Sequence, residues 1–254
     1  MNWLLLRGLA REQRHWGRFV SVLRESRPND TVHCLDLAGT GTEVSRKSPS
    51  TIAGITEDVR ARLLELKRSH PGPWSLLGVS LGGMVSMQWV ASHPEDFERV
   101  VLINTSASNL SVPWRRMRLA VLPKVLRSLL GGDELTRQKR ILSITARMVA
   151  DPTPIAAEWA EIQRTAPVAR ANVLRQLWAA ARYRAPERLA IPTLILAGAE
   201  DPLCDPDCPK RLSQRFGAPL DTHPRAGHDL AVDDPEWLSE RIEAWISGTS
   251  KRAA

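Results

Sequence analysis

The sequence has few cysteines and no long hydrophobic run, and both absences exclude classes of protein. Only three of its 254 residues are cysteine. Cys34, Cys204 and Cys208 cannot form a disulfide framework, and an odd number of cysteines indicates free thiols. The longest early apolar run, at 3–6, is far shorter than the roughly 20 residues of a membrane span. It is also too short for the core of a signal peptide, so we expect no membrane span and a cytoplasmic location.

Metal ligands in a recognisable pattern are lacking as well. Cys204 and Cys208 have no second pair of ligands at a spacing typical of zinc sites. We therefore predict no metal site. We expect no organic cofactor either.

The remaining composition is that of an ordinary folded domain. Hydrophobic residues make up 43% of the chain and charged residues 25%, which excludes a disordered, collagen-like or coiled-coil protein. A chain of this length forms one large α/β domain or two small ones. No internal repeat is visible.

Short apolar runs alternate with longer helical patterns along the chain. In the helical patterns, apolar residues recur at intervals that place them on one face, as do Val59, Leu63 and Leu66. This alternation is typical of a mostly parallel sheet with helices on both faces. The expected strands are 2–7, 31–36, 74–79, 99–104, 193–197 and 220–223, and the expected helices are 13–25, 51–69, 81–92, 205–216 and 235–246.

The segment 107–190 breaks this alternation. It has no strand pattern and contains several helical stretches separated by proline or glycine. An all-helical insertion between two strands of a parallel sheet is typical of a lid over the carboxyl ends of the strands. The segment also holds 13 arginines and 2 lysines against 6 acidic residues, a net charge of +9 in a chain whose total is +7.

A serine lies at a sharp turn between an expected strand and an expected helix. The motif 78–82 reads Gly-Val-Ser-Leu-Gly and is flanked by the apolar run 74–77 and the helical pattern 83–92. A serine in this context is held in strained backbone geometry, and the glycines let strand and helix approach closely. The motif predicts Ser80 as a nucleophile, and the alternative is a glycine-rich helix start with an incidental serine.

A neutral serine hydroxyl is a weak nucleophile, so the motif requires a histidine base and a carboxylate that orients it. Asp201 lies in a loop after the apolar run 193–197, and His228 lies in a loop before the final helix. The order Ser, Asp, His along the chain is the one that an open sheet with a serine elbow uses. We therefore predict Ser80, Asp201 and His228 as a catalytic triad.

Other residues compete for two of these roles. Glu200, Asp205 and Asp207 are further acids beside Asp201, although Asp205 also suits a helix cap. His223 is the alternative base, but its position at a strand end favours a structural histidine.

These motifs resemble those of the α/β-hydrolase superfamily, close to its small serine esterases and lipase-like members. The resemblance rests on the elbow 78–82, the acid loop 198–202, the Gly-His pair at 227–228 and the strand-end motif 36–41, and it covers almost the whole chain. It implies an α/β-hydrolase fold. The two usual N-terminal strands are absent, because the first expected strand starts at Asn2, so we expect about six strands in place of eight.

The resemblance also implies an oxyanion hole made by the backbone N–H groups of Leu9 and Leu81. Each such donor stabilises the transition state by about 3 kcal/mol. The family usually carries a histidine before the glycine of this loop, whereas this sequence has Arg7 before Gly8. Superfamily members that act as dehalogenases or epoxide hydrolases carry an aspartate at the elbow, so Ser80 favours acyl transfer.

The helical insertion divides the chain into two expected domains. Residues 1–106 and 191–254 form the α/β-hydrolase core, and residues 107–190 form the helical cap, or lid.

The sequence has nine tryptophans and one tyrosine. Trp114, Trp159 and Trp178 lie in the lid and are the candidates for lining the substrate pocket, although packing inside the lid is the alternative that the pattern favours.

The expected function is hydrolysis of a small-molecule carboxylic ester through an acyl-enzyme. Alternatives that keep the triad are a thioesterase, an acyltransferase, a carrier-protein methyl ester esterase, and a relative that cleaves carbon–carbon bonds or performs perhydrolysis. A different class of alternative is a ligand-binding or signalling protein with little turnover, which Arg7 in the oxyanion loop favours.

The basic lid has three interpretations. It is a solvated helical surface, because arginine is a good helix former, or it attracts an acidic carrier protein as a partner. Nucleic acid is disfavoured, because no helix-turn-helix, zinc or aromatic-basic pattern accompanies the charge. The oligomeric state is left open by the sequence, although the missing strands would expose a sheet edge.

Overall fold

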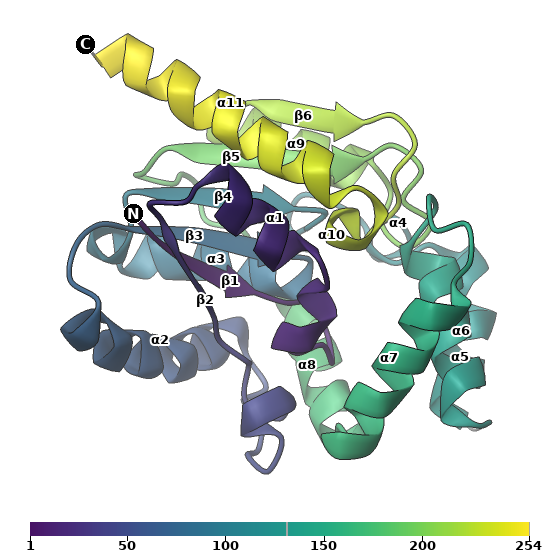
Figure 1. Cartoon of the computed structure of the whole chain (residues 1–254). Helices are drawn as coiled ribbons and strands as arrows, with labels where there is room; N and C mark the ends of the chain where they lie inside the picture. Colours follow the sequence, from purple (N-terminus) through teal and green to yellow (C-terminus); the bar gives the residue numbers. More distant parts are fainter. Residues whose placement is uncertain (131, 254) are drawn as a thin grey trace.

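A sheet of six parallel strands runs through the centre of the computed structural model, which describes residues 1–130 and 132–253 (Figure 1). The strand order is β2-β1-β3-β4-β5-β6. The six predicted strands are confirmed, each to within two residues at its ends. They are β1 (Asn2–Leu6), β2 (Thr31–Cys34), β3 (Trp74–Val79), β4 (Arg99–Ile103), β5 (Thr193–Gly198) and β6 (Leu220–His223).

The inner strands are continuously apolar because both faces of the sheet are covered. In β1, Trp3 and Leu5 join the hydrophobic core on one face, and Leu4 and Leu6 join the core on the other. All four side chains are fully buried. Alternate residues of a strand point to opposite faces, so a strand between two cores needs apolar side chains at every position.

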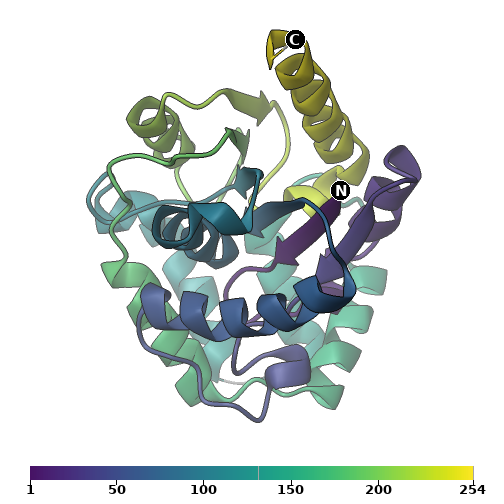
Figure 2. The same cartoon turned by 90° about the vertical axis from the view of Figure 1, so that its left-hand side faces the viewer.

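Helices cover the two faces of the sheet (Figures 1 and 2). One core contains side chains of α1 (Phe19–Ser26), α10 (Leu230–Asp233) and α11 (Pro235–Ala253). The other contains side chains of α2 (Ile52–Ser69), α3 (Leu81–Ser92) and α9 (Asp207–Phe216). The arrangement is a three-layer α/β sandwich.

Three of the predicted helices differ from the observed ones by more than one residue. The predicted helix 13–25 is divided into a 3₁₀ turn (Gln13–Trp16) and α1, because Gly17 adopts a φ of 51° between them. Helix α9 begins at Asp207, where the Asp205 carboxylate accepts a hydrogen bond from the Asp207 N–H at 3.0 Å. The N-cap residue itself is Pro206, so Asp205 precedes the cap and binds the first N–H of the helix. Helix α11 continues past the expected end at 246 to Ala253.

The lid segment, residues 107–190, lies between β4 and β5 and beyond the carboxyl ends of the strands (Figure 1). Its described residues form helices and no strand. A separate hydrophobic cluster that includes Leu142, Ala156 and Trp159 holds two of these helices together. The helices are α4 (Pro113–Arg116), α5 (Leu122–Leu130), α6 (Glu134–Thr145), α7 (Thr153–Thr165) and α8 (Arg170–Arg182), with a short 3₁₀ turn (Leu119–Val121) before α5.

Several lid arginines attach the lid segment to the loop that follows β5 and to the start of α9. Arg118 donates a hydrogen bond to the backbone oxygen of Asp201 at 3.2 Å, and Arg147 donates one to that of Glu200 at 3.3 Å. Arg115 forms an ion pair with Asp207. Part of the basic charge of the lid therefore has a structural role.

Strand β3 passes into helix α3 through a turn in which backbones approach too closely for side chains. A Cβ atom on Gly78 would lie 2.4 Å from the carbonyl oxygen of Gly82. A Cβ atom on Gly82 would lie 2.3 Å from the carbonyl oxygen of Leu6. The glycines of the elbow motif are therefore required by the packing of β1, β3 and α3.

Gly78→Ala is expected to lower the free energy of unfolding by about 1–3 kcal/mol, because its Cβ would meet backbone atoms that cannot move independently. Gly248→Ala in α11 is a matched control, since nothing lies within 4 Å of a Cβ at that position. This control should be neutral or slightly stabilising, because alanine favours a helix more than glycine does. Urea unfolding measures both variants, and equal losses would contradict the close approach at the elbow.

Candidate active site

Ser80 lies at the junction of β3 and α3 in a strained backbone conformation. Its φ of 55° and ψ of −113° are rarely adopted by residues with a side chain. The conformation is held by two hydrogen bonds, from the Ser80 N–H to Ile103 O at 2.9 Å and from Thr105 Oγ1 to Ser80 O at 2.8 Å. Strain that is held in this way is characteristic of functional sites.

Asp201 and His228 form a buried pair close to this serine. Asp201 Oδ2 lies 2.6 Å from His228 Nδ1. Asp201 Oδ1 accepts hydrogen bonds from the N–H groups of Leu203 and Cys204, both at 2.8 Å. These bonds fix the carboxylate, which in turn fixes the imidazole and leaves Nε2 as the ring nitrogen available for proton transfer.

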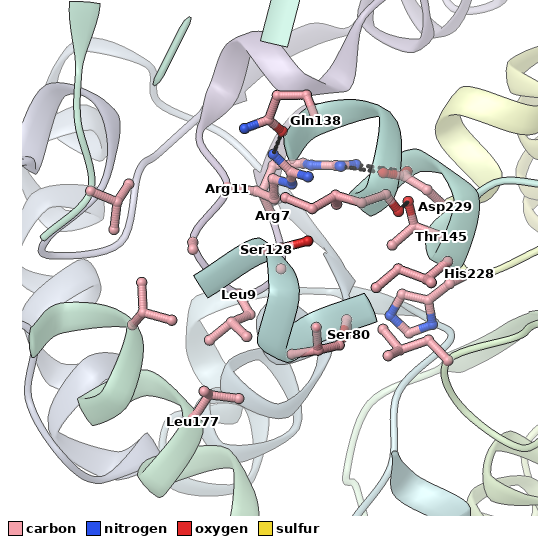
Figure 3. A pocket seen from close by; sticks show the side chains of 18 of the residues that line it. Arg7, Leu9, Arg11, Ser80, Ser128, Gln138, Thr145, Leu177, His228 and Asp229 are labelled. Atoms are coloured by element: carbon pink, nitrogen blue, oxygen red, sulfur yellow. Dashed lines mark hydrogen bonds and ion pairs between the residues drawn. The ribbon is translucent and has the colours of Figure 1, made fainter. Parts of the chain in front are cut away.

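Figure 3 shows Ser80 and His228 at the same end of a cavity that both residues line. No hydrogen bond joins the two side chains among those of the residues described. Serine–histidine contacts are often long in enzymes without substrate. The structure therefore brings together the three residues predicted as the triad.

The competing acids and the competing histidine lie elsewhere. Glu200 is exposed, and Asp205 and Asp207 form ion pairs with arginines at the surface. His223 Nδ1 accepts hydrogen bonds from two backbone N–H groups, and its Nε2 lies 3.2 Å from Asp234. These contacts make His223 a structural residue at the end of β6.

The environment of His228 favours its charged form. Burial alone would lower the pKa of His228, but the charge and hydrogen bond of Asp201 and the charge of Asp229 raise it above the usual value of 6.5. Arg7 acts in the opposite direction. The imidazole can thus accept a proton and keep it during a reaction step.

Arg7, the residue that stands in place of the family's usual histidine, forms a buried ion pair with Asp229. The guanidinium donates to both carboxylate oxygens, with one N–O distance of 3.0 Å. Its carbon lies 4.7 Å from the centre of the Trp16 ring. Because Asp229 follows His228 directly, this pair joins the histidine loop to the end of β1.

Asn104 is a further positioning residue, which the sequence motifs do not predict. Its Nδ2 donates to the carbonyl oxygens of Gly227 and His228 at 3.0 and 2.7 Å, and its Oδ1 accepts from the Gly198 N–H at 3.0 Å. The amide therefore connects the ends of β4 and β5 to the histidine loop. The sequence feature that could have identified Asn104 is a polar residue at the carboxyl end of an apolar strand.

The histidine loop is also attached to the lid segment. The Asp233 carboxylate accepts hydrogen bonds from the N–H groups of Gly227, Arg147 and Met148, each at 2.6–2.8 Å. The Asp229 N–H donates to Thr145 O at 2.7 Å. The carboxyl end of α6 and the histidine loop are thus held together by several bonds.

The loop after β1 lies against the elbow. A Cβ atom on Gly8 would lie 3.3 Å from Ser80 Cβ, so the two backbones are close. Among the hydrogen bonds of the described residues, the N–H groups of Leu9 and Leu81 have no acceptor. The two N–H groups predicted for the oxyanion hole thus have no partner among these bonds.

The cavity has a volume of about 250 Å³ and is lined mainly by aliphatic side chains. The loop after β1 forms one wall, and helices of the lid segment form the other. The polar lining residues include Arg7, Arg11, Arg137 and Gln138. The aliphatic lining consists of Leu9, Val79, Met117, Val125, Ile141, Ile144, Val168, Val173, Leu177 and Leu203.

The three lid tryptophans do not line this cavity, which corrects the prediction. Trp159 is 2% exposed and contacts His15 and the Arg11 guanidinium. Trp114 and Trp178 are 58% and 57% exposed on the outside of the lid. The indole of Trp159 belongs to the hydrophobic cluster of α6 and α7 and contacts the chain after β1, so it has the packing role that was the alternative.

Comparison with known proteins agrees with this geometry. The model of the alpha/beta hydrolase family matches residues 3–241, and the chain belongs to this family. It is 29% identical to a monoglyceride lipase of Mus musculus over 92% of this chain and 82% of that protein. It is 26% identical to a pimeloyl-[acyl-carrier protein] methyl ester esterase of Nitrosospira multiformis, over 84% and 81% of the two chains.

A solved structure of similar fold is a putative lipase from Acinetobacter baumannii, with a TM-score of 0.79 and 20% identity over 99% of this chain and 85% of that one. The chain matches only 17% of the length of the biotin biosynthesis bifunctional protein BioHC of Teredinibacter turnerae, at 31% identity. Within the described residues, no helix has the length and apolar character to cross a bilayer. In that same part of the chain, no three potential ligands among His, Cys, Asp and Glu are grouped to hold a metal ion.

Arg7→Met would leave Asp229 buried and unpaired beside His228. We expect the free energy of unfolding to fall by about 3–5 kcal/mol. The pKa of His228 should rise further, because Arg7 is the cation that opposes its protonation. Urea unfolding and an NMR titration of the His228 ring measure the two effects.

The control is the double variant Arg7→Met/Asp229→Leu, which removes both charges. It should recover much of the lost stability, since an apolar pair can replace a buried ion pair. It should also lower the pKa of His228 relative to the single variant, because Asp229 raises that pKa. A single variant as stable as the wild type would contradict the role given to the ion pair.

Proposed function

We propose that this protein is a serine hydrolase that cleaves carboxylic esters through an acyl-enzyme. The observation that carries the proposal is the placement of Ser80, on a strained turn, beside the buried Asp201–His228 pair at one end of an aliphatic cavity. Membership of the alpha/beta hydrolase family supports it. The names of the relatives, a lipase and a methyl ester esterase, point to the same chemistry.

In the first half of the reaction, Ser80 Oγ attacks the ester carbonyl while His228 Nε2 accepts the serine proton. The carbonyl oxygen becomes an oxyanion, which the N–H groups of Leu9 and Leu81 stabilise by about 3 kcal/mol each. The carbon–oxygen bond to the alcohol then breaks, and the alcohol leaves with the proton held by His228. The acyl group remains on Ser80.

In the second half, water takes the place of the alcohol. His228 accepts a proton from the water as it attacks the acyl-enzyme, and returns this proton to Ser80 as the carboxylic acid leaves. Asp201 stabilises the imidazolium in both halves. This role agrees with the raised pKa of His228, for which the Asp201 carboxylate is the main favourable contributor.

A second candidate is an esterase whose ester is carried by an acidic protein. The neighbouring helices α5 and α6 present Lys124, Arg127, Lys139 and Arg140, and Lys124 and Arg127 are exposed. Contacts across the pair hold them close, from Lys124 Nζ to Ser143 Oγ at 3.3 Å and from Arg140 to Arg127 O at 3.4 Å. The similarity to a methyl ester esterase of an acyl-carrier protein favours this candidate.

The triad roles predict a clear kinetic result with p-nitrophenyl esters from acetate to laurate. The wild type should turn over many times, and Ser80→Ala, His228→Ala and Asp201→Asn should each lower kcat by about 10⁴-fold. Glu200→Gln is the matched control, because it removes a neighbouring but exposed carboxylate, and its kcat should stay unchanged. Circular dichroism checks that each variant is folded.

Failure of the folded wild type to turn over any of these esters would contradict the simple esterase. Stoichiometric acylation of Ser80 without repeated turnover would instead support the binding or signalling alternative. A Glu200→Gln variant as defective as Asp201→Asn would contradict the assignment of the acid.

If an acidic carrier docks on the lid, salt should lower kcat/KM for a carrier-bound methyl ester but not for a free one. The reason is that exposed charges are screened over about 8 Å at physiological ionic strength. The double variant Lys124→Glu/Arg127→Glu should lower kcat/KM for the carrier-bound ester alone, by tenfold or more. Arg68→Glu in α2 is the control, since it lies near the opposite end of the sheet. Equal effects of both variants would contradict a docking face on the lid.

A further inference from the structure

Arg11 places a positive charge in the cavity, away from Ser80. Figure 3 shows Arg11 and Gln138 across the cavity from Ser80. Aliphatic side chains line the same cavity. A molecule with its ester at Ser80 and a second polar group at its other end would therefore contact both.

The hydrogen-bonding partners of Arg11 within the protein are neutral. Its Nη1 donates to Gln138 Oε1 at 3.1 Å and lies 3.1 Å from His15 Nε2. The guanidinium carbon lies 4.1 Å from the centre of the Trp159 ring. Burial, followed by the charge of Arg11, strongly lowers the pKa of His15, so this imidazole is neutral. Arg11 Nη2 is buried and has no hydrogen-bond partner among the described residues.

The nearby carboxylates are bound to other groups. Asp229 pairs with Arg7, and Glu134 pairs with Arg137 and accepts from Gln138. Burial and the charge of Arg7 lower the pKa of Arg11 to about 9, although Asp229 and Glu134 act in the opposite direction. A buried cation without its own anion is costly, so this arginine is suited to an anionic ligand.

We infer that Arg11 binds a carboxylate at the far end of the substrate, so that the preferred esters are monoesters of aliphatic dicarboxylic acids. The inference rests on the proposed esterase function and defines its substrate class. A carboxylate would accept a hydrogen bond from the unpartnered Nη2, and charge-assisted bonds to arginine are among the strongest in proteins. The aliphatic lining would contact the methylene chain between the two ends.

The test compares matched ester pairs at constant ionic strength. The p-nitrophenyl monoesters of adipic and suberic acid carry a terminal carboxylate, and p-nitrophenyl hexanoate and octanoate end in a methyl group. The wild type should favour the carboxylates in kcat/KM. Arg11→Gln should lower the ratio of carboxylate to methyl ester by about ten- to a hundredfold, and Arg11→Lys should lower it less, because the charge remains.

Arg164→Gln in α7 is the matched control, because it removes a positive charge from the exposed surface of the lid. It should keep the wild-type ratio. A ratio that falls equally in Arg164→Gln would reveal a general field effect and overturn the inference. An Arg11→Gln variant that loses activity equally on both members of each pair would show a purely structural role, which would overturn it as well.

Binding to the Ser80→Ala variant separates this inference from the proposed function. Calorimetry should detect adipate or suberate binding to Ser80→Ala, with at least tenfold weaker binding in Ser80→Ala/Arg11→Gln. If methyl-ended esters are hydrolysed without any preference for carboxylates, the carboxylate site is wrong and the esterase stands. If no ester is hydrolysed but the Arg11-dependent binding is present, the esterase is wrong and the carboxylate site stands.

Discussion

The parallel register of the central strands is the constraint on which the candidate site depends. Leu6 pairs with Gly78, and Val79 pairs with Ile103, so these strands end at the same edge of the sheet. The residues that follow, Arg7, Ser80 and Asn104, therefore lie close together although about a hundred positions separate the first from the last. The apolar cores on both faces hold this register, and the two glycines of the elbow allow α3 to start against it.

At this edge of the sheet, most of the buried ionic groups bind hydrogen-bond donors or a group of opposite charge. Asp201 is satisfied by two backbone N–H groups and His228, and Asp229 is satisfied by Arg7. Both carboxylates act on the same imidazole, and the cation limits their combined effect on its pKa. Arg11 differs from them, because its hydrogen-bonding partners among the described residues are neutral. This contrast is the reason for assigning it to substrate recognition.

The sequence predicted those parts of the structure that local patterns determine. The strands and the elbow follow from apolar runs and glycines, and the order Ser80, Asp201, His228 follows from loops placed after strands. The cavity wall could not be predicted, because the directions of lid side chains depend on how helices pack, and Trp159 packs inside the lid. The partner of Arg7 lies 222 positions away at Asp229, and no local pattern relates two residues so distant in sequence.

The hydrogen bonds between the end of α6 and the histidine loop fix these two segments relative to each other. Asp233 holds the N–H groups of residues on both sides, and Thr145 accepts from the N–H of Asp229. A displacement of this end of α6 must either break these bonds or carry the imidazole away from Ser80. The cavity wall at this end of α6 and the position of the imidazole are therefore coupled, so a substitution that moves one also moves the other.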